Sequence, residues 1–397
     1  MVSQKSIKNN IWKFYVSMGI CSVRFIAPIR IIYLLSFGLS YAEIAIIEMI
    51  AVIVTLILEI PTGIFADLFG RKIAMIIAYF LSVAAFFLMS SGSNLSTFIL
   101  GWSLSGAADA FESGSRDALI YDTLKTLSRT NEYLKLKSRF IMLNTVFVII
   151  GSLLGAHFYT LDRRLPWYFF TAAIALSGFV FALIKEPSSS IKRGRAKEHL
   201  ERFKNSFIFS FSKLSVRWLI LFGLILALPM YVFTTLLGQP YLISRGFNVP
   251  SLGIIYAIIT AFSGLVGSFS HKLETIFRQR LSFLLVSLSF SILLVLMGII
   301  KAPIALILVI ALHAVNNYKT VIIDNYLNSR IDSDSRATVL SVQSFTTTAI
   351  VALLFAFIGR LTDIFSINAV LIALGPLIGL LSLPLLISFR PSKHSSL

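Results

Sequence analysis

The chain has 397 residues, of which 57% are hydrophobic and 13% are charged, and its mean hydropathy is +0.86. A soluble globular domain carries about 25% charged residues, so this composition excludes an ordinary soluble protein and indicates an integral membrane protein. The formal net charge is +17. A nucleic-acid partner is not expected, because the basic residues follow the pattern of membrane topology described below.

Twelve apolar stretches are long enough to cross roughly 30 Å of hydrocarbon as α-helices. The sequence therefore predicts an all-α integral membrane protein with twelve transmembrane helices. In chain order, the predicted spans are 12–36, 42–66, 73–92, 96–120, 139–161, 166–185, 216–243, 251–270, 281–300, 303–326, 338–360 and 367–389.

Lysine and arginine residues gather on one side of this predicted topology. If both termini are cytoplasmic, 26 basic residues fall in cytoplasmic segments and only five, Arg163, Arg164, Arg245, Lys301 and Arg360, in outer segments. This is the positive-inside bias, and it fits only an even number of spans. We therefore expect both termini in the cytoplasm, and the short loops favour a bacterial cytoplasmic membrane.

The longest polar segment, from Lys185 to Phe207, separates six predicted spans from six. It predicts an N-terminal six-helix bundle at 1–185, a cytoplasmic linker at 186–213 and a C-terminal six-helix bundle at 214–397. An amphipathic helix at about 196–210 is expected within the linker, with its basic face against anionic membrane lipid.

The two halves carry similar residues in the same order. The segment ALIYDTL at 118–124 resembles VIIDNYL at 321–327, which places Asp122 and Asp324 at the inner ends of the fourth and tenth spans. Further matching positions follow in each half: Ser138 and Ser335, Arg139 and Arg336, Gly155 and Gly359, Asp162 and Asp363. This order predicts a duplicated six-span unit, an architecture typical of secondary transporters with a binding site near mid-membrane.

Residues 59–72 read EIPTGIFADLFGRK and directly follow the second span. They resemble a loop signature of the major facilitator superfamily, although Phe65 and Leu68 depart from it. The matching residues are Gly63, Asp67, Gly70, Arg71 and Lys72. The resemblance implies the major facilitator fold with two six-helix pseudo-repeats and alternating access, but it does not specify the substrate.

In that family this cluster latches the inner gate. Its glycines permit a tight turn, and Asp67 can pair with a basic residue or accept hydrogen bonds from a helix N-terminus. Acidic and basic residues near the inner ends of neighbouring spans are the expected remaining parts of the gate: Glu59, Arg116, Asp117, Asp122 and Asp324.

Within the superfamily, the chain resembles the drug:proton antiporter (multidrug efflux) branch. Gly151 and Gly155 match a glycine pair of the antiporter motif, whereas Ala156 replaces its proline and Trp102 falls where an arginine is usual. This resemblance implies proton-coupled export of drug-like compounds.

Charges within the spans form the candidate transport site. Trp102, Ser105, Asp109, Glu112 and Arg116 share one face of a predicted fourth helix, within a sector of about 100°. At about 1.5 Å of rise per residue, Arg24 of the first span lies level with Asp109. The same rise places Arg30 level with Glu48, and Glu59 near Arg116 and Glu112.

Charges at this depth face the protein interior and usually have partners. We therefore expect Arg24, Asp109 and Glu112, together with Arg30 and Glu48, to bind substrate or carry the coupling proton. The alternative is that these residues form structural ion pairs. In the tenth span His313, Asn316 and Asn317 could hydrogen-bond a substrate, or His313 could titrate; packing between helices is the alternative there.

The sequence contains no phosphate-binding loop, metal-ligand cluster or nucleophile motif, which argues against an ATP-driven pump or an enzyme. We expect a monomer that needs no metal or cofactor and takes a small-molecule substrate and protons. The leading hypothesis is a proton-coupled exporter of small amphipathic or drug-like compounds. The alternatives are an importer or facilitator of an organic anion using Arg24 and Arg30, and a non-transporting membrane sensor or scaffold.

Overall fold

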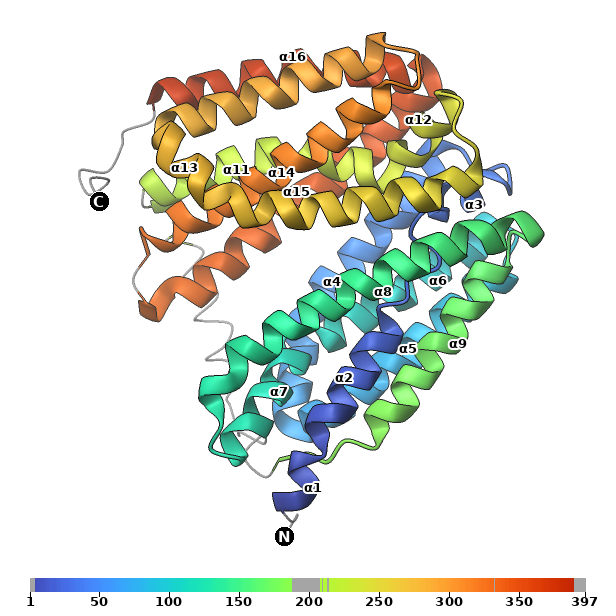
Figure 1. Ribbon diagram of the computed structural model, residues 1–397, viewed down its shortest axis with the longest axis vertical. Helices are drawn as coiled ribbons and strands as arrows, with labels where there is room; N and C mark the ends of the chain where they lie inside the picture. Colours follow the sequence, from blue (N-terminus) through green and yellow to red (C-terminus); the bar gives the residue numbers. More distant parts are fainter. Residues whose placement is uncertain (1–3, 188–207, 209, 213, 332, 389–397) are drawn as a thin grey trace. The chain divides into compact units, whose positions relative to one another are not determined.

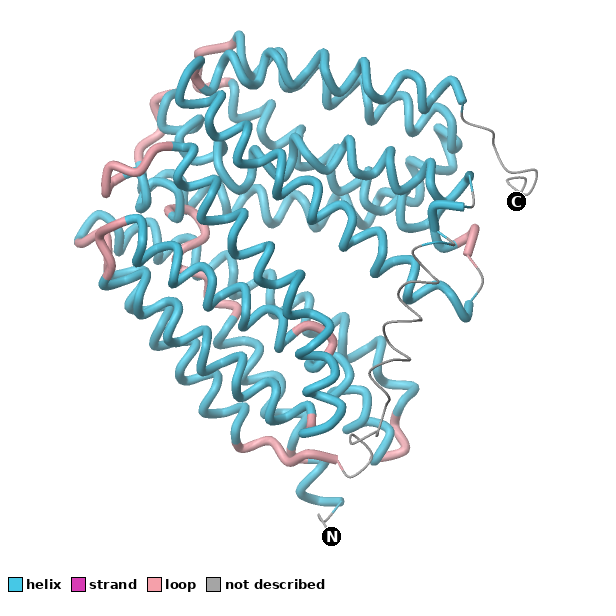
Figure 2. Tube along the Cα trace, turned by 180° about the vertical axis from the view of Figure 1, so that it is seen from behind, coloured by secondary structure: helices cyan, strands magenta, loops and turns pink. Residues whose placement is uncertain are grey.

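The computed structural model describes residues 4–187, 208, 210–212, 214–331 and 333–388. Every regular element in these ranges is helical, and Figure 2 draws helices and loops but no strand there. The predicted all-α class is thereby confirmed. The amphipathic helix predicted at 196–210 falls outside the described residues, apart from Ile208 and Ser210.

The chain forms two compact units, which are described separately. Unit 1 comprises Met1–Leu39, Ile46–Leu200 and Val249–Ala257, and unit 2 comprises Ser40–Ala45, Glu201–Asn248 and Ile258–Leu397. The helices before the linker are α1 (Gln4–Lys8), α2 (Asn10–Cys21), α3 (Arg30–Leu35), α4 (Tyr41–Phe69), α5 (Arg71–Ser91), α6 (Leu95–Glu112), α7 (Ser115–Thr126), η1 (Thr130–Glu132), α8 (Tyr133–Leu161) and α9 (Leu165–Ala182). Those after it are α11 (Leu214–Val232), the π-turn η2 (Phe233–Leu237), α12 (Gly238–Ser244), α13 (Val249–Ile299), α14 (Ala305–Asn328), α15 (Ser333–Phe365) and α16 (Ile367–Ser388).

Nine of the described helices are long and apolar enough to cross a membrane by themselves. Two predicted spans do not form single helices, because the first is divided into α2 and α3 and the fourth into α6 and α7. The predicted eighth and ninth spans belong to one continuous helix, α13. Its ribbon turns back on itself near its label in Figure 1. Residues 271–280, which lie between these two predicted spans, are therefore helical.

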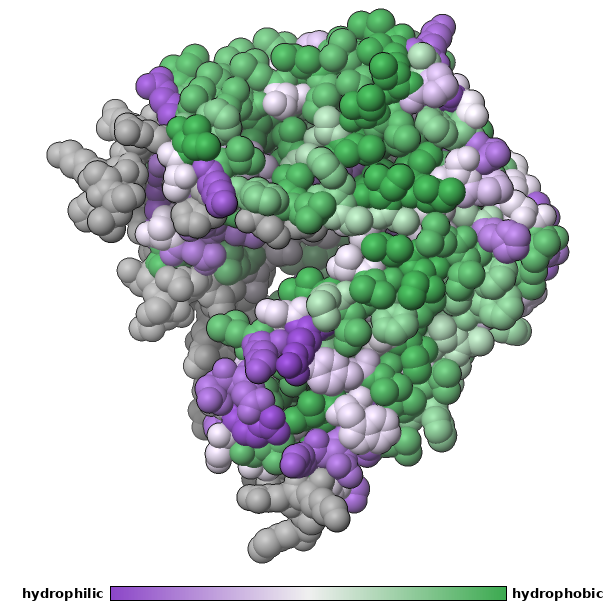
Figure 3. Space-filling view, viewed as in Figure 1, coloured by the Kyte–Doolittle hydropathy of each residue, from purple (hydrophilic) through white to green (hydrophobic). Residues whose placement is uncertain are grey.

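Unit 1 is held together by α5, which packs against α6 and α9, while α2 lies beside α9 (Figure 1). A buried hydrogen-bond network joins these helices: the Ser17 hydroxyl lies 3.0 Å from the Tyr79 hydroxyl and 2.9 Å from that of Ser177. Such mutual bonds let polar side chains lie inside an apolar bundle. Hydrophobic side chains cover the visible length of this unit, and hydrophilic ones gather at the end that carries α7 (Figure 3).

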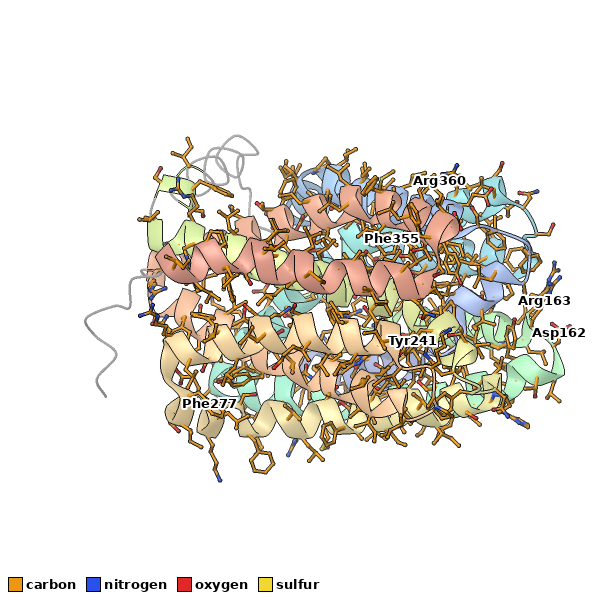
Figure 4. All side chains as sticks on the ribbon, turned by 90° about the horizontal axis from the view of Figure 1, so that it is seen from above. Asp162, Arg163, Tyr241, Phe277, Phe355 and Arg360 are labelled. Atoms are coloured by element: carbon orange, nitrogen blue, oxygen red, sulfur yellow. The ribbon has the colours of Figure 1, made fainter. Side chains whose placement is uncertain are left out.

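Unit 2 is built around α11, which packs against α14, α15 and α16. Tyr241 and Phe355 lie within this unit (Figure 4), and the Tyr241 hydroxyl donates to the backbone carbonyl of Met297 at 3.0 Å. Buried Arg245 donates to the same carbonyl at 2.9 Å and to the Asn368 side chain at 2.7 Å. The guanidinium of Arg245 therefore ties the end of α12 to α13 and α16.

Asp363, near the end of α15, caps the first turn of α4. This first turn belongs to unit 2. Its carboxylate accepts hydrogen bonds from the backbone N–H groups of Tyr41 and Ala42, both at 2.9 Å. A carboxylate in this position satisfies free helix donors and interacts favourably with the helix dipole.

We expect Asp363→Ala to lower the free energy of unfolding by about 1 kcal/mol, with Asp363→Asn intermediate because it keeps an acceptor. Thermal melting in detergent measures this order; equal melting temperatures would contradict the capping role.

Candidate functional site

The first predicted span is interrupted at mid-length. Helix α2 ends at Cys21, and residues 22–29 form successive tight turns in which, for example, the Arg24 N–H donates to the Ser22 carbonyl at 2.8 Å. Pro28 has no N–H to continue a helical ladder. Non-helical backbone at membrane depth is tolerated only where it is covered by protein or lines a cavity. Arg24 lies inside this break and is exposed.

Two glycines of α8 allow this irregular backbone to pack directly on that helix. A Cβ at Gly151 would lie 2.6 Å from the backbone nitrogen of Arg24, and a Cβ at Gly155 would overlap the Phe25 carbonyl. The Asn144 side chain of α8 also donates to the Ser22 hydroxyl at 2.9 Å. The glycine pair therefore supports the segment that holds Arg24.

The fourth predicted span is also interrupted, immediately after two of its acids. Asp109 and Glu112 occupy the last turn of α6, and Arg116 lies in the first turn of α7. Gly114 between them has a φ of +73°, a conformation that favours glycine. The expected single helix with one continuous polar face is thus wrong at residues 113–114. An Arg116–Glu112 ion pair bridges the break.

Charges from both breaks form one cluster in unit 1. Arg24, Glu112 and Arg116 are all close enough to act electrostatically on the Asp109 carboxylate. Among the described residues, however, no ion pair within 4.0 Å includes Asp109 or Arg24. Asp109 is also exposed. The cluster therefore presents one acid and one base that can interact with a proton or a bound molecule.

A second pair of charges lies apart from the breaks. Arg30 and Glu48 are 3.1 Å apart, and Glu48 is 6% exposed. The pairing agrees with the depth estimated from the sequence. Glu59 was expected near the level of Arg116 and Glu112. In the structure Glu59 is exposed, and Arg116 pairs with Glu112 instead. Depth along a helix does not specify the direction in which a side chain points around the helix axis. That direction determines whether Arg116 pairs with Glu59 or with Glu112.

The loop signature at 63–72 forms a compact ionic cluster. Arg71 pairs with Asp122 of α7 and lies 3.9 Å from Asp67. The pairing of Asp122 with this turn was expected, whereas Asp117 instead binds Lys137 at 2.8 Å. The Arg71–Asp122 pair therefore joins the loop directly to the inner part of the fourth predicted span.

The turn itself depends on one glycine of the signature. Gly70 has a φ of +103°, whereas Gly63 lies inside α4 rather than in the turn. Glu186 covers this turn: its carboxylate accepts from the backbone N–H of Lys72 at 3.3 Å, and a Cβ at Gly70 would lie 2.6 Å from it. No sequence motif indicated this partner, which lies 114 residues from Lys72.

The predicted polar cluster of the tenth span is partly engaged in helix packing. His313 Nδ1 lies 2.9 Å from the Val309 carbonyl of its own helix, and Asn317 donates to the Ser263 carbonyl at 3.3 Å. The Asn316 carbonyl accepts from the Thr320 hydroxyl at 3.0 Å. Asp324, expected at the inner gate, is exposed. Lys319 on the same helix is buried, and sequence reasoning assigned it no role.

The sequence matches the family model of the Major Facilitator Superfamily over residues 14–356. The chain belongs to the Major Facilitator Superfamily. Members of this superfamily are transporters and not enzymes, which is the class that the sequence predicted. A relative is the "Uncharacterized MFS-type transporter YxaM" of Bacillus subtilis (strain 168), which is 28% identical over 256 residues. That match covers 63% of this chain and 61% of the relative, so the chain spans about three fifths of the relative's length.

Solved structures with the same fold include several transporters. The crystal structure of the nucleoside transporter NupG has a TM-score of 0.77 at 12% identity and covers 97% of this chain and 100% of NupG. A bacterial homologue of the human lysosomal transporter Spinster, inward-facing and unoccupied, has a TM-score of 0.75 at 13% identity, with 98% and 99% covered. At these identities the likeness shows the fold of this superfamily member and leaves its substrate open.

Proposed function

We propose that this transporter exports small amphipathic molecules in exchange for protons, and that Arg24, Asp109 and Glu112 form its coupling site. The observation that carries the proposal is the meeting of these charges at two interrupted helices. Transporters of several folds place substrate and ion sites at discontinuous helices near mid-membrane. Ionisable residues at that depth are functional candidates by default.

The chemistry of the cluster supports proton coupling. Two carboxyl groups lie one turn apart, Asp109 and Glu112. Arg24 and Arg116 both act electrostatically on Asp109, and Arg116 pairs with Glu112. Binding a proton removes one negative charge from this group and weakens its hold on Arg24. A proton can drive transport only if it has different affinities for the two conformations, so the attraction between Arg24 and Asp109 must differ between them.

The contacts of Arg71 support an inner gate at the loop signature. Asp122 pairs with Arg71, Asp67 lies near it, and Glu186 covers Gly70. α7 carries both Arg116 and Asp122, six residues or about one and two-thirds helical turns apart. A shift of α7 would therefore reach the proposed coupling site and the proposed gate together.

An importer or facilitator of an organic anion is the second candidate. It is favoured by Arg24, which has no ion pair within 4.0 Å among the described residues. It is disfavoured by Arg30, whose guanidinium is already bound to a buried carboxylate. The balance of acids and bases around Asp109 is better suited to a titrating group than to a purely anionic ligand.

Purified protein in liposomes with an imposed pH gradient tests this function. Ethidium serves as a cationic probe, 11-(dansylamino)undecanoate as an anionic one, and an enclosed pH dye reports proton movement. We expect probe and protons to move in opposite directions, unlike in protein-free liposomes. Movement in the same direction would favour an importer, and a probe flux that ignores the pH gradient would contradict proton coupling.

A further inference from the structure

Lys319 is a buried amine near the middle of α14. It is 8% exposed and shares a helix face with Leu312, Ile323 and Leu327, which are 0%, 3% and 0% exposed. No hydrogen bond or ion pair of Lys319 is found among the described side chains. Asp324, which acts on it electrostatically, is exposed and lies about 140° further around the helix. A lysine at this depth requires an anionic or acceptor partner.

The neighbouring helices show where this amine lies. Gly223 of α11 lacks a side chain, and a Cβ built there would have Ile323 Cδ1 at 3.6 Å and Gln343 Nε2 at 3.7 Å. The side chains of Ile323 on α14 and Gln343 on α15 therefore meet above the same point of α11. Lys319 precedes Ile323 by one helical turn on the same face.

The contacts at Gly223 imply that a second buried polar group lies near the level of Lys319. α14 and α15 are consecutive and antiparallel. A step of one helical turn away from the connection between them goes from Ile323 to Lys319 on α14. On α15 the same step leads from Gln343 to Thr346. The Thr346 hydroxyl is buried and has no hydrogen-bond partner in the described part of the chain. Buried polar groups normally have partners, so this position is built to receive one.

We propose that Lys319, with Gln343 and Thr346, binds the anionic group of the transported molecule, a carboxylate or phosphate. An ammonium, a side-chain amide and a hydroxyl all offer hydrogen-bond donors, and a carboxylate or phosphate accepts several of them at once. This inference rests on the proposed transport function and narrows its substrate class to amphipathic organic anions.

Binding of a matched pair of probes to the full-length protein tests the site. The pair is 11-(dansylamino)undecanoate and its uncharged methyl ester, followed by dansyl fluorescence in detergent. Wild type is expected to bind the carboxylate at least tenfold more tightly than the ester. Lys319→Gln should lose most of this ratio, Lys319→Arg should retain it, and the exposed Lys301→Gln is the control.

Several outcomes separate this proposal from its rivals. An unchanged affinity for the ester shows that Lys319→Gln is folded, so an unchanged carboxylate-to-ester ratio in that variant would overturn the proposal. If the carboxylate binds through Lys319 but does not move across liposomes, the ligand is a resident lipid or free anion, and the substrate assignment fails. If the carboxylate moves through Lys319 without proton counter-movement, the anion site stands and proton-coupled export fails.

Discussion

Replacing Gly155 with alanine is expected to destabilise the protein by about 2–3 kcal/mol. The added Cβ would overlap the backbone carbonyl of Phe25, and backbone gives way less readily than the end of a flexible side chain. Either α8 moves or the turns at 22–29 are displaced, and with them Arg24. We therefore expect both a lower melting temperature in detergent and a loss of transport.

Gly63→Ala provides the matched control for this prediction. Gly63 lies inside α4, and a Cβ there would meet nothing within 4 Å. Alanine is favoured over glycine within a helix by roughly 0.5–1 kcal/mol, so this variant should melt at the same temperature as wild type or higher. If Gly155→Ala melts like Gly63→Ala, the close packing of α8 on the first break is wrong.

Replacing Arg71 with glutamine is expected to cost about 2–3 kcal/mol of stability. The change removes the guanidinium that pairs with Asp122 and lies near Asp67. The loss is smaller than for a fully buried pair, because the side chains of Arg71 and Asp122 are 17% and 12% exposed. Urea or thermal unfolding of the purified protein measures the effect.

The double variant Arg71→Gln with Asp122→Asn separates pairing from simple loss of charge. Two neutral amides leave no unpaired charge in the gate cluster, so the double variant should recover part of the stability lost in Arg71→Gln. The Lys137→Gln variant is the control, because its pair with Asp117 is about half exposed and should contribute at most about 1 kcal/mol. Strictly additive losses in the double variant would rule out a coupled pair.

The sequence predicted those features that depend on depth and composition. Apolar length located the spans, and rise per residue paired Arg30 with Glu48. The same reasoning brought Arg24 near Asp109. The position of Asp122 near the inner end of its span placed it beside the turn at 63–72. Each of these requires only the position of a residue along its helix, which a sequence determines well.

The two helix breaks were not predicted, although the residues that cause them were visible. Hydropathy averaged over a span does not register a single Pro28 or Gly114, because an average over about twenty residues hides the effect of one residue on the backbone. The setting of Lys319 was missed for another reason. The residues proposed to act with it, Gln343 and Thr346, come from a different helix, and only the packing of α14 and α15 on α11 relates them to α14. The same limit applies to Glu186, which reaches Gly70 from the end of another predicted span.

The main proposal is that the acids beside the break in the fourth predicted span, Asp109 and Glu112, couple protons to transport. It is tested most directly by comparing two fluxes of one probe in liposomes containing the double variant Asp109→Asn with Glu112→Gln. We predict that accumulation driven by a pH gradient falls to the level of protein-free liposomes, while exchange of probe without a gradient persists. The exposed Glu132→Gln should retain both fluxes. Accumulation that survives in the double variant would contradict the account.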